Sequence, residues 1–146
     1  MTARSPLTGP ARVAARLPED TRVYAIGDIH GRADLLSDLL ETIRKDAARA
    51  PERRQVLVTL GDYVDRGDWT RHVVDMLLED PLPGAELVTL KGNHEELLLR
   101  FLEAPEEVAR LWLGNGGDAT LRSYGIDPSR YLGLTDGWQR MSHLLA

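Results

Sequence analysis

The sequence contains no cysteine among its 146 residues, so disulfide bonds and thiolate metal sites are excluded. It has no apolar run of the length that a membrane span requires. Basic residues are fewer than acidic ones, 18 against 23, and the resulting net charge of -5 gives no electrostatic reason to expect a nucleic-acid partner. We therefore expect neither a nucleic-acid nor a membrane partner. The absence of cysteine is compatible with a cytoplasmic location, which we predict.

The first twenty residues differ in character from the rest of the chain. They lack the apolar core of a secretory signal, and prolines at positions 6, 10 and 18 argue against one long helix. We predict a loosely ordered arm over residues 1–20. The chain as a whole is 42% hydrophobic, which is ordinary for a soluble protein, and residues 21–146 are interpreted as one domain.

Apolar strands and amphipathic helices alternate after the arm. Three β-branched runs are predicted as strands: 22–26, 55–60 and 86–91. Three segments with apolar residues at helical spacing are predicted as helices: 32–50, 70–80 and 95–103. Thr70 is a candidate cap of the second helix. This order is typical of an α/β fold with a parallel sheet, and beyond Pro105 we expect short helices interrupted by glycines.

Each predicted strand leads to a glycine that is followed by polar side chains. The three turns read GDIHG at 27–31, GDYVDRG at 61–67 and GNHE at 92–95. Because the carboxyl ends of parallel strands lie along one edge of a sheet, we expect the three turns to converge there. Their glycines fit sharp turns and close backbone approach: Gly27, Gly31, Gly61, Gly67 and Gly92.

The side chains of these turns are suited to holding divalent cations. Asp28, His30 and Asp62 offer one imidazole and two carboxylates. This set suits manganese, iron or zinc, and it suits magnesium less because of the imidazole. Asp62 has a second oxygen that could bridge to a second cation, which Asn93 would also hold. Two such metals clamp a phosphate and activate a shared water.

Asp65, His94 and Arg66 are the remaining polar residues of chemical interest in the turns. A carboxylate that holds an imidazole favours its protonated form, so the ring can give a proton to a leaving alkoxide. We expect Asp65 and His94 to form such an acid pair, and Arg66 to clamp phosphate oxygens. Any one of the turns could be a plain polar loop, but the three together favour a phosphate-hydrolysing metal site.

The three motifs resemble those of the calcineurin-like metallophosphoesterases, and among them the bacterial serine/threonine phosphoprotein phosphatases, whose signature reads GDxHG, GDxVDRG and GNHE. The resemblance implies a hydrolase that cleaves phosphate monoesters of a phosphorylated protein or a small phosphoester by attack of metal-bound hydroxide. It implies two divalent ions, most of all manganese, with iron or zinc as alternatives. It assigns metal binding to Asp28, His30, Asp62 and Asn93, acid catalysis to Asp65 and His94, and substrate contact to Arg66 and Asn93.

Symmetrical diadenosine tetraphosphatases have similar motifs and are the alternative within this chemistry. They usually lack the full DRG and end the third motif in Asp, so Asp65, Arg66 and Glu95 favour the protein-phosphatase side. The stretch WLGNGGDATLRSYGID also resembles the region after GNHE in small bacterial members of the family.

The second half of the family pattern does not occur in this sequence. The family's HA or HAG motif and its GH motif supply further metal-binding histidines, whereas here the one histidine after His94 is His143, followed by leucine. The resemblance therefore covers the N-terminal half of the family's α/β/β/α sandwich and implies a domain truncated at its C-terminus. A truncated, non-catalytic fragment is accordingly the second alternative to an active enzyme.

Other conspicuous residues are interpreted structurally. Glu95 is a first-turn residue favoured by the helix dipole rather than a ligand. His72 is a packed or surface residue of its helix. Trp69 packs on the helix, or else shapes the mouth of the cleft, and we favour packing. Trp112 is expected in the core or half-buried.

Overall fold

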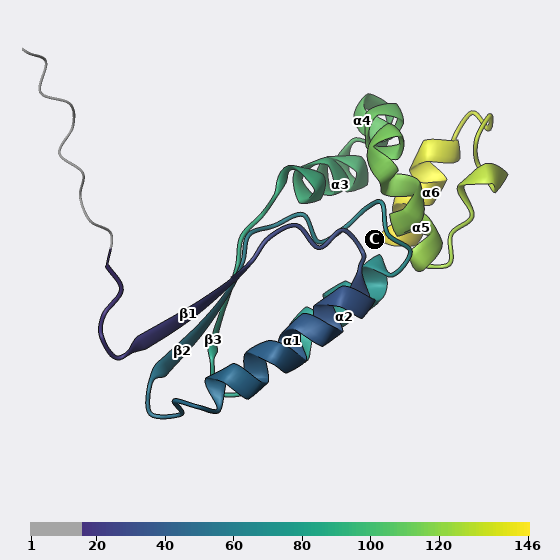
Figure 1. Cartoon of the computed structure of the whole chain (residues 1–146). Coiled ribbons are helices and arrows are strands. Elements are labelled where there is room, and N and C mark those ends of the chain that lie inside the picture. The colour runs from purple at the N-terminus through teal and green to yellow at the C-terminus, as the bar shows by residue number, and fades with distance from the viewer. Residues whose placement is uncertain (1–15) are drawn as a thin grey trace, which may run out of the picture.

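The computed structural model describes residues 16–146 (Figure 1). Residues 1–15 of the predicted arm lie outside the described residues, and residues 16–20 are an exposed segment without helix or strand. Within the described part of the chain, no helix is both long and apolar enough to cross a bilayer.

A three-stranded parallel sheet forms the first half of the fold. Its strands are β1 (Thr21–Ile26), β2 (Arg54–Thr59) and β3 (Glu86–Thr89), in the order β1-β2-β3. The predicted α/β fold with a parallel sheet is confirmed. The register pairs Ile26 with Thr59 and Thr59 with Thr89, so the three strands end at the same level. The turns that follow them therefore start side by side.

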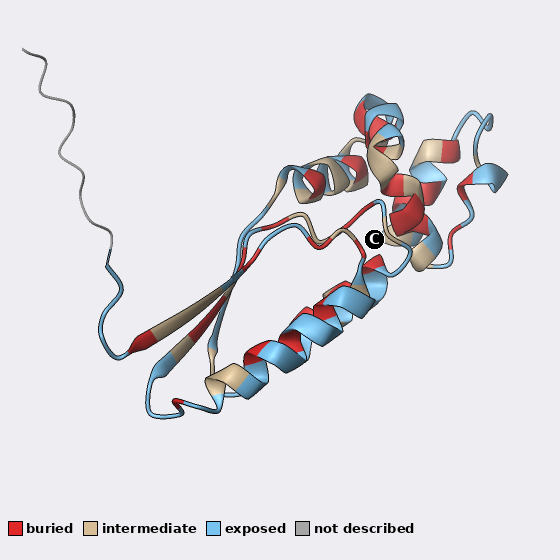
Figure 2. Ribbon diagram, viewed as in Figure 1, coloured by how far each residue is buried: buried red, intermediate tan, exposed pale blue. Residues whose placement is uncertain are grey.

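Two helices, α1 (Ala33–Ala47) and α2 (Thr70–Leu78), lie together on one face of the sheet (Figure 1). The core between them and the sheet is apolar, and its buried residues include Ile26, Leu36, Leu40, Ile43, Leu57, Val73 and Leu77. Leu36, Leu40 and Ile43 form the buried stripe that helical spacing predicts, which is visible along the helix in Figure 2, whereas Leu35 and Leu39 are exposed. The helix predicted over 32–50 ends earlier, at Ala47.

The remaining helices gather beyond the carboxyl ends of the strands (Figure 1). They are α3 (Asn93–Glu103), α4 (Pro105–Trp112), α5 (Asp118–Ser123), the short η2 (Pro128–Arg130) and α6 (Gly137–Leu145). A widened turn, η1 (Leu113–Gly117), joins α4 to α5 and contains Gly116 with a left-handed φ of 101°. These helices share a second apolar core that includes Phe101, Val108, Trp112, Leu121 and Met141. The prediction of short helices interrupted by glycines is confirmed.

Thr70 does not cap α2, contrary to the prediction. It is the first residue of the helix, and its side chain makes no capping hydrogen bond. The hydroxyl instead lies 3.3 Å from the hydroxyl of Thr120 in α5, and both threonines are fully buried. This contact joins the two halves of the molecule close to the ends of the strands.

Candidate functional site

The turns that follow β1 and β2 are joined by backbone hydrogen bonds. The N–H groups of Ile29 and His30 both donate to the carbonyl oxygen of Asp62, each at 2.9 Å. The N–H group of Gly31 donates to the carbonyl oxygen of Tyr63 at 2.8 Å. The convergence expected from the parallel sheet is therefore present for these two turns.

Glu95 joins the third turn to the second. Its carboxylate accepts hydrogen bonds from the N–H groups of Asp62 at 2.7 Å, Tyr63 at 2.8 Å and Gly92 at 2.9 Å. A residue interpreted from the sequence as a helix-dipole residue thus organises the loop that carries Asp62. Sequence reasoning misses this role because the main partners lie more than 30 positions away.

Glycines let the turns approach one another closely. A Cβ atom on Gly67 would lie 2.3 Å from the carbonyl oxygen of His30, and one on Gly61 would lie 2.4 Å from the nitrogen of Gly92. The close approach predicted for the motif glycines is thus found at Gly67, Gly61, Gly31 and Gly92. The prediction of close approach is wrong at Gly27, because nothing lies within 4 Å of its Cβ position.

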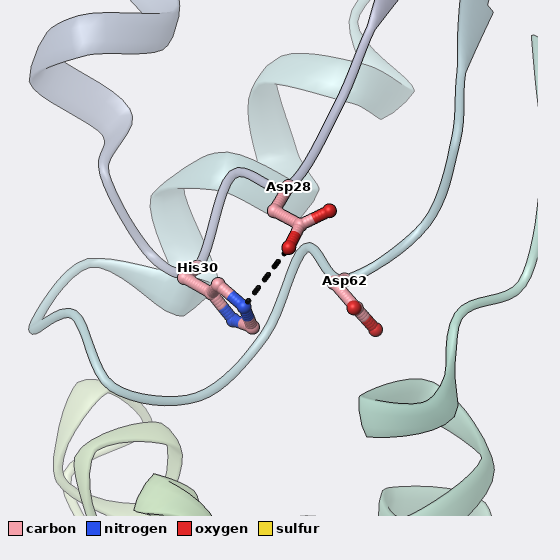
Figure 3. Close-up of side chains that lie close together, drawn as sticks. All are labelled: Asp28, His30 and Asp62. Atoms are coloured by element: carbon pink, nitrogen blue, oxygen red, sulfur yellow. Dashed lines mark ion pairs between the residues drawn. The ribbon is translucent and has the colours of Figure 1, made fainter.

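Asp28, His30 and Asp62 form a cluster of three side chains that could hold a metal ion, called the ligand cluster below (Figure 3). One ligand atom from each lies within 4.8 Å of the others. The Nδ1–H group of His30 donates to the carbonyl oxygen of Val64 at 2.9 Å, which leaves a lone pair on Nε2. Because this nitrogen and the two carboxylates are ordinary ligands of manganese, iron and zinc, the residues fit a divalent cation. A cation bound to Nε2 would take the place of the Arg66 guanidinium, which lies 2.9 Å from the same nitrogen.

Asn93 stands beside the cluster on the third turn. It is exposed and is the first residue of α3. Both of its neighbours touch Asp62: the N–H group of His94 donates to Oδ1 of Asp62 at 3.1 Å, and the Gly92 backbone packs against the same side chain. The backbone therefore places Asn93 near Asp62, and its role as a ligand stays a prediction.

Asp65 and His94 form a buried pair. Their side chains are 0% and 2% exposed, and Nδ1–H of His94 donates to Oδ2 of Asp65 at 2.7 Å. Burial raises the pKa of Asp65, and hydrogen bonds from His94 and Thr120 oppose the rise. The structure thus brings together the two residues that the sequence analysis pairs.

Arg66 links the pair to the ligand cluster. Its guanidinium lies 2.9 Å from Nε2 of His30 and 3.0 Å from Nε2 of His94. Because arginine can only donate, both ring nitrogens accept, and each imidazole carries its proton on Nδ1. A phosphate that binds Arg66 would therefore lie beside both the ligand cluster and His94.

The site residues have strained backbone conformations. His30, Asp62, Asp65 and Arg66 have φ values of 44°, 55°, 72° and 69°, in the left-handed region. Among the non-glycine residues that the structure describes, Asp80 alone shares this property. Such strain is typical of functional sites, where the surrounding structure holds it in place.

Replacing Arg66 tests this strain. Arg66→Gly is expected to have a free energy of unfolding about 1 kcal/mol higher than Arg66→Ala, because glycine adopts a left-handed φ without a steric cost. Urea unfolding of the two variants measures the difference. The matched pair at Arg71, an exposed residue inside α2, should show the opposite order because glycine weakens a helix. An alanine variant as stable as the glycine variant at position 66 would contradict the assigned conformation.

Outside the motifs, Trp69 is 46% exposed, and its packing on the helix stays a prediction. His72 and His143 are exposed on their helices. Trp112 is fully buried, as expected, but its indole also contacts Asp65, which the sequence analysis did not anticipate. The one signal in the sequence for this contact is the resemblance of WLGNGGDATLRSYGID to the region that follows GNHE in small bacterial relatives.

The chain is similar in sequence to a known protein family and to curated proteins of a bacterium and a yeast. The family model described as "Calcineurin-like phosphoesterase" matches residues 21–141. Serine/threonine-protein phosphatase 1 of Salmonella typhimurium is 32% identical over 96 residues, which cover 66% of this chain and 39% of that protein. An uncharacterized protein of Schizosaccharomyces pombe is 36% identical over 91 residues, covering 57% of this chain and 27% of its own length. The chain thus matches well under half the length of these relatives.

Proposed function

Because the chain belongs to the calcineurin-like phosphoesterase family, we propose that it hydrolyses phosphate monoesters in a metal-dependent reaction of the serine/threonine phosphatase type. One observation carries the proposal: Arg66 joins the Asp28–His30–Asp62 cluster to the buried Asp65–His94 pair. In this arrangement the ligand cluster, Arg66 and the Asp65–His94 pair would all act on one bound phosphate.

The ligand cluster would hold the metal ions. Asp28, His30 and Asp62 would bind one divalent cation, and Asp62 together with Asn93 a second. When bound, such a pair supplies Lewis-acid charge and an activated water for attack on phosphorus. We propose manganese, because one imidazole with several oxygen ligands suits this ion better than magnesium.

Arg66 and His94 would act on the phosphate and the leaving group. In the structure, Nε2 of His94 accepts a hydrogen bond from Arg66. Binding of phosphate oxygens by the guanidinium frees this nitrogen to hold a proton. His94 then passes the proton from Nε2 to the leaving alkoxide as the P–O bond breaks, while Nδ1–H stays bonded to Asp65.

Relatives support a phosphorylated protein as the substrate, because the Salmonella typhimurium protein is named as a serine/threonine-protein phosphatase. A phosphoserine peptide is therefore expected to be hydrolysed faster than diadenosine tetraphosphate. The reverse order would favour the dinucleoside polyphosphate alternative.

The experiment that tests the proposal is hydrolysis of p-nitrophenyl phosphate by the purified chain. We expect turnover with added Mn²⁺ and none in excess EDTA, because the ligand cluster needs its cations. Circular dichroism of the same sample verifies that it is folded. A folded sample without turnover in Mn²⁺ would contradict the proposal for this chain and support a non-catalytic fragment.

A further inference from the structure

Two residues outside the three motifs bind the carboxylate of Asp65. The indole N–H of Trp112 lies 3.0 Å from both carboxylate oxygens. The hydroxyl of Thr120 donates to Oδ1 at 2.7 Å. With His94 on Oδ2, the carboxylate has three side-chain donors, and these four residues are 2% exposed or less.

Thr120 holds both the side chain and the backbone of Asp65. Its hydroxyl oxygen accepts the N–H group of Asp65 at 2.9 Å while its hydrogen goes to the carboxylate. Since the one hydroxyl hydrogen of Thr120 is used, the Thr70 hydroxyl 3.3 Å away must donate to Thr120. These contacts leave the Asp65 side chain little freedom to rotate.

The turn η1 brings Trp112 to this position. A Cβ atom on Gly117 would lie 2.4 Å from the Trp112 indole, so the ring packs directly on the glycine. The carbonyl oxygen of the neighbouring Gly116 accepts the N–H group of Arg66 at 3.1 Å. One turn therefore supports both the indole that binds Asp65 and the backbone of Arg66.

A purely structural role is the competing explanation for Trp112. A buried tryptophan needs a partner for its N–H group, and any acceptor would satisfy it. Here, however, the donors of Trp112 and Thr120 converge on one carboxylate, and that carboxylate also holds His94. Thr120 binds Oδ1 and leaves Oδ2 for the imidazole, while Trp112, which lies 3.0 Å from both oxygens, holds the carboxylate as a whole.

We propose that Trp112 and Thr120 are positioning residues that hold the Asp65 carboxylate with Oδ2 aimed at Nδ1 of His94. This inference rests on the proposed function, in which His94 delivers a proton to the leaving oxygen. The side-chain hydrogen bonds of both residues go to Asp65 and, for Thr120, also to Thr70. Both act through Asp65, and they extend the site to α4 and α5.

Hydrolysis by side-chain variants tests the proposal. Thr120→Val keeps the shape but removes the hydroxyl, and Trp112→Phe removes the N–H group. Each is expected to lower kcat about 10- to 100-fold with little change in KM, as is typical when a supporting hydrogen bond is lost. Thr120→Ser keeps the hydroxyl and should retain most of the wild-type kcat. Both losses should vanish in an Asp65→Ala background, because alanine leaves no side-chain oxygen for the two residues to bind.

An NMR measurement separates this proposal from the proposed function. The Nδ1–H proton of His94 should give a resonance far downfield in the wild-type chain and in Thr120→Ser, because it is bonded to a buried carboxylate. This resonance should shift or broaden in Thr120→Val and Trp112→Phe. If the wild-type chain shows no turnover, the proposed function fails. The NMR resonance then still tests whether Trp112 and Thr120 position Asp65. An unchanged resonance, or losses of kcat that persist in Asp65→Ala, would overturn the positioning roles of Trp112 and Thr120.

Discussion

Asp62→Asn is expected to lower the affinity for Mn²⁺ about 100-fold or more, since even the loss of a supporting group around a metal ligand costs 10- to 100-fold. Asp62 is one of the three clustered ligand side chains, and asparagine removes its charge while keeping its size. The backbone of residue 62 should keep its bonds to Glu95, Ile29 and His30. Isothermal titration of metal-free protein with Mn²⁺ measures the effect.

His94→Gln is the matched control for this experiment. It should leave the Mn²⁺ affinity close to that of the wild type, because His94 touches Asp62 through its backbone N–H group. Hydrolysis of a phosphate ester should nevertheless fall by about 10²- to 10⁴-fold, as expected for loss of a general acid. Wild-type Mn²⁺ affinity in Asp62→Asn would contradict the ligand cluster. Wild-type hydrolysis in His94→Gln would contradict the acid role.

Gly67→Ala is expected to lower the free energy of unfolding by about 3 kcal/mol, at the upper end of the usual cost of overpacking. The new Cβ would lie 2.3 Å from the carbonyl oxygen of His30 and 2.8 Å from the carbonyl carbon of Gly31. These are backbone atoms, and the backbone of the first turn is already bonded to Asp62 and Tyr63. Urea unfolding followed by circular dichroism measures the loss.

The control for Gly67 lies in the first motif itself. Gly27, like Gly67, has no left-handed φ, but nothing lies within 4 Å of its Cβ position. Gly27→Ala should therefore change the free energy of unfolding by no more than about 0.5 kcal/mol. Gly67→Ala should also weaken Mn²⁺ binding by displacing His30, whereas Gly27→Ala should not. Equal stabilities of the two variants would contradict the close packing of the turns.

The sequence by itself determined the local elements and their order. The strand-and-helix alternation from Thr21 to Glu103 follows from apolar periodicity, which depends on neighbours a few positions apart. It also indicated the convergence of Asp28, His30 and Asp62, because parallel strands place their carboxyl ends at one edge of the sheet. Three short motifs after three such strands then identified the family.

The tertiary structure alone decided how the turns are held. Glu95 bonds to backbone groups more than 30 positions away, and Thr120 bonds to Asp65 across 55 positions. The indole of Trp112 reaches Asp65 because Gly117 leaves room for the ring. Local periodicity predicts which face of a helix is buried, but the partner of a buried polar group depends on how distant elements pack. For that reason the sequence was enough to predict the candidate metal ligands, whereas only the folded chain shows which residues hold their turns in place.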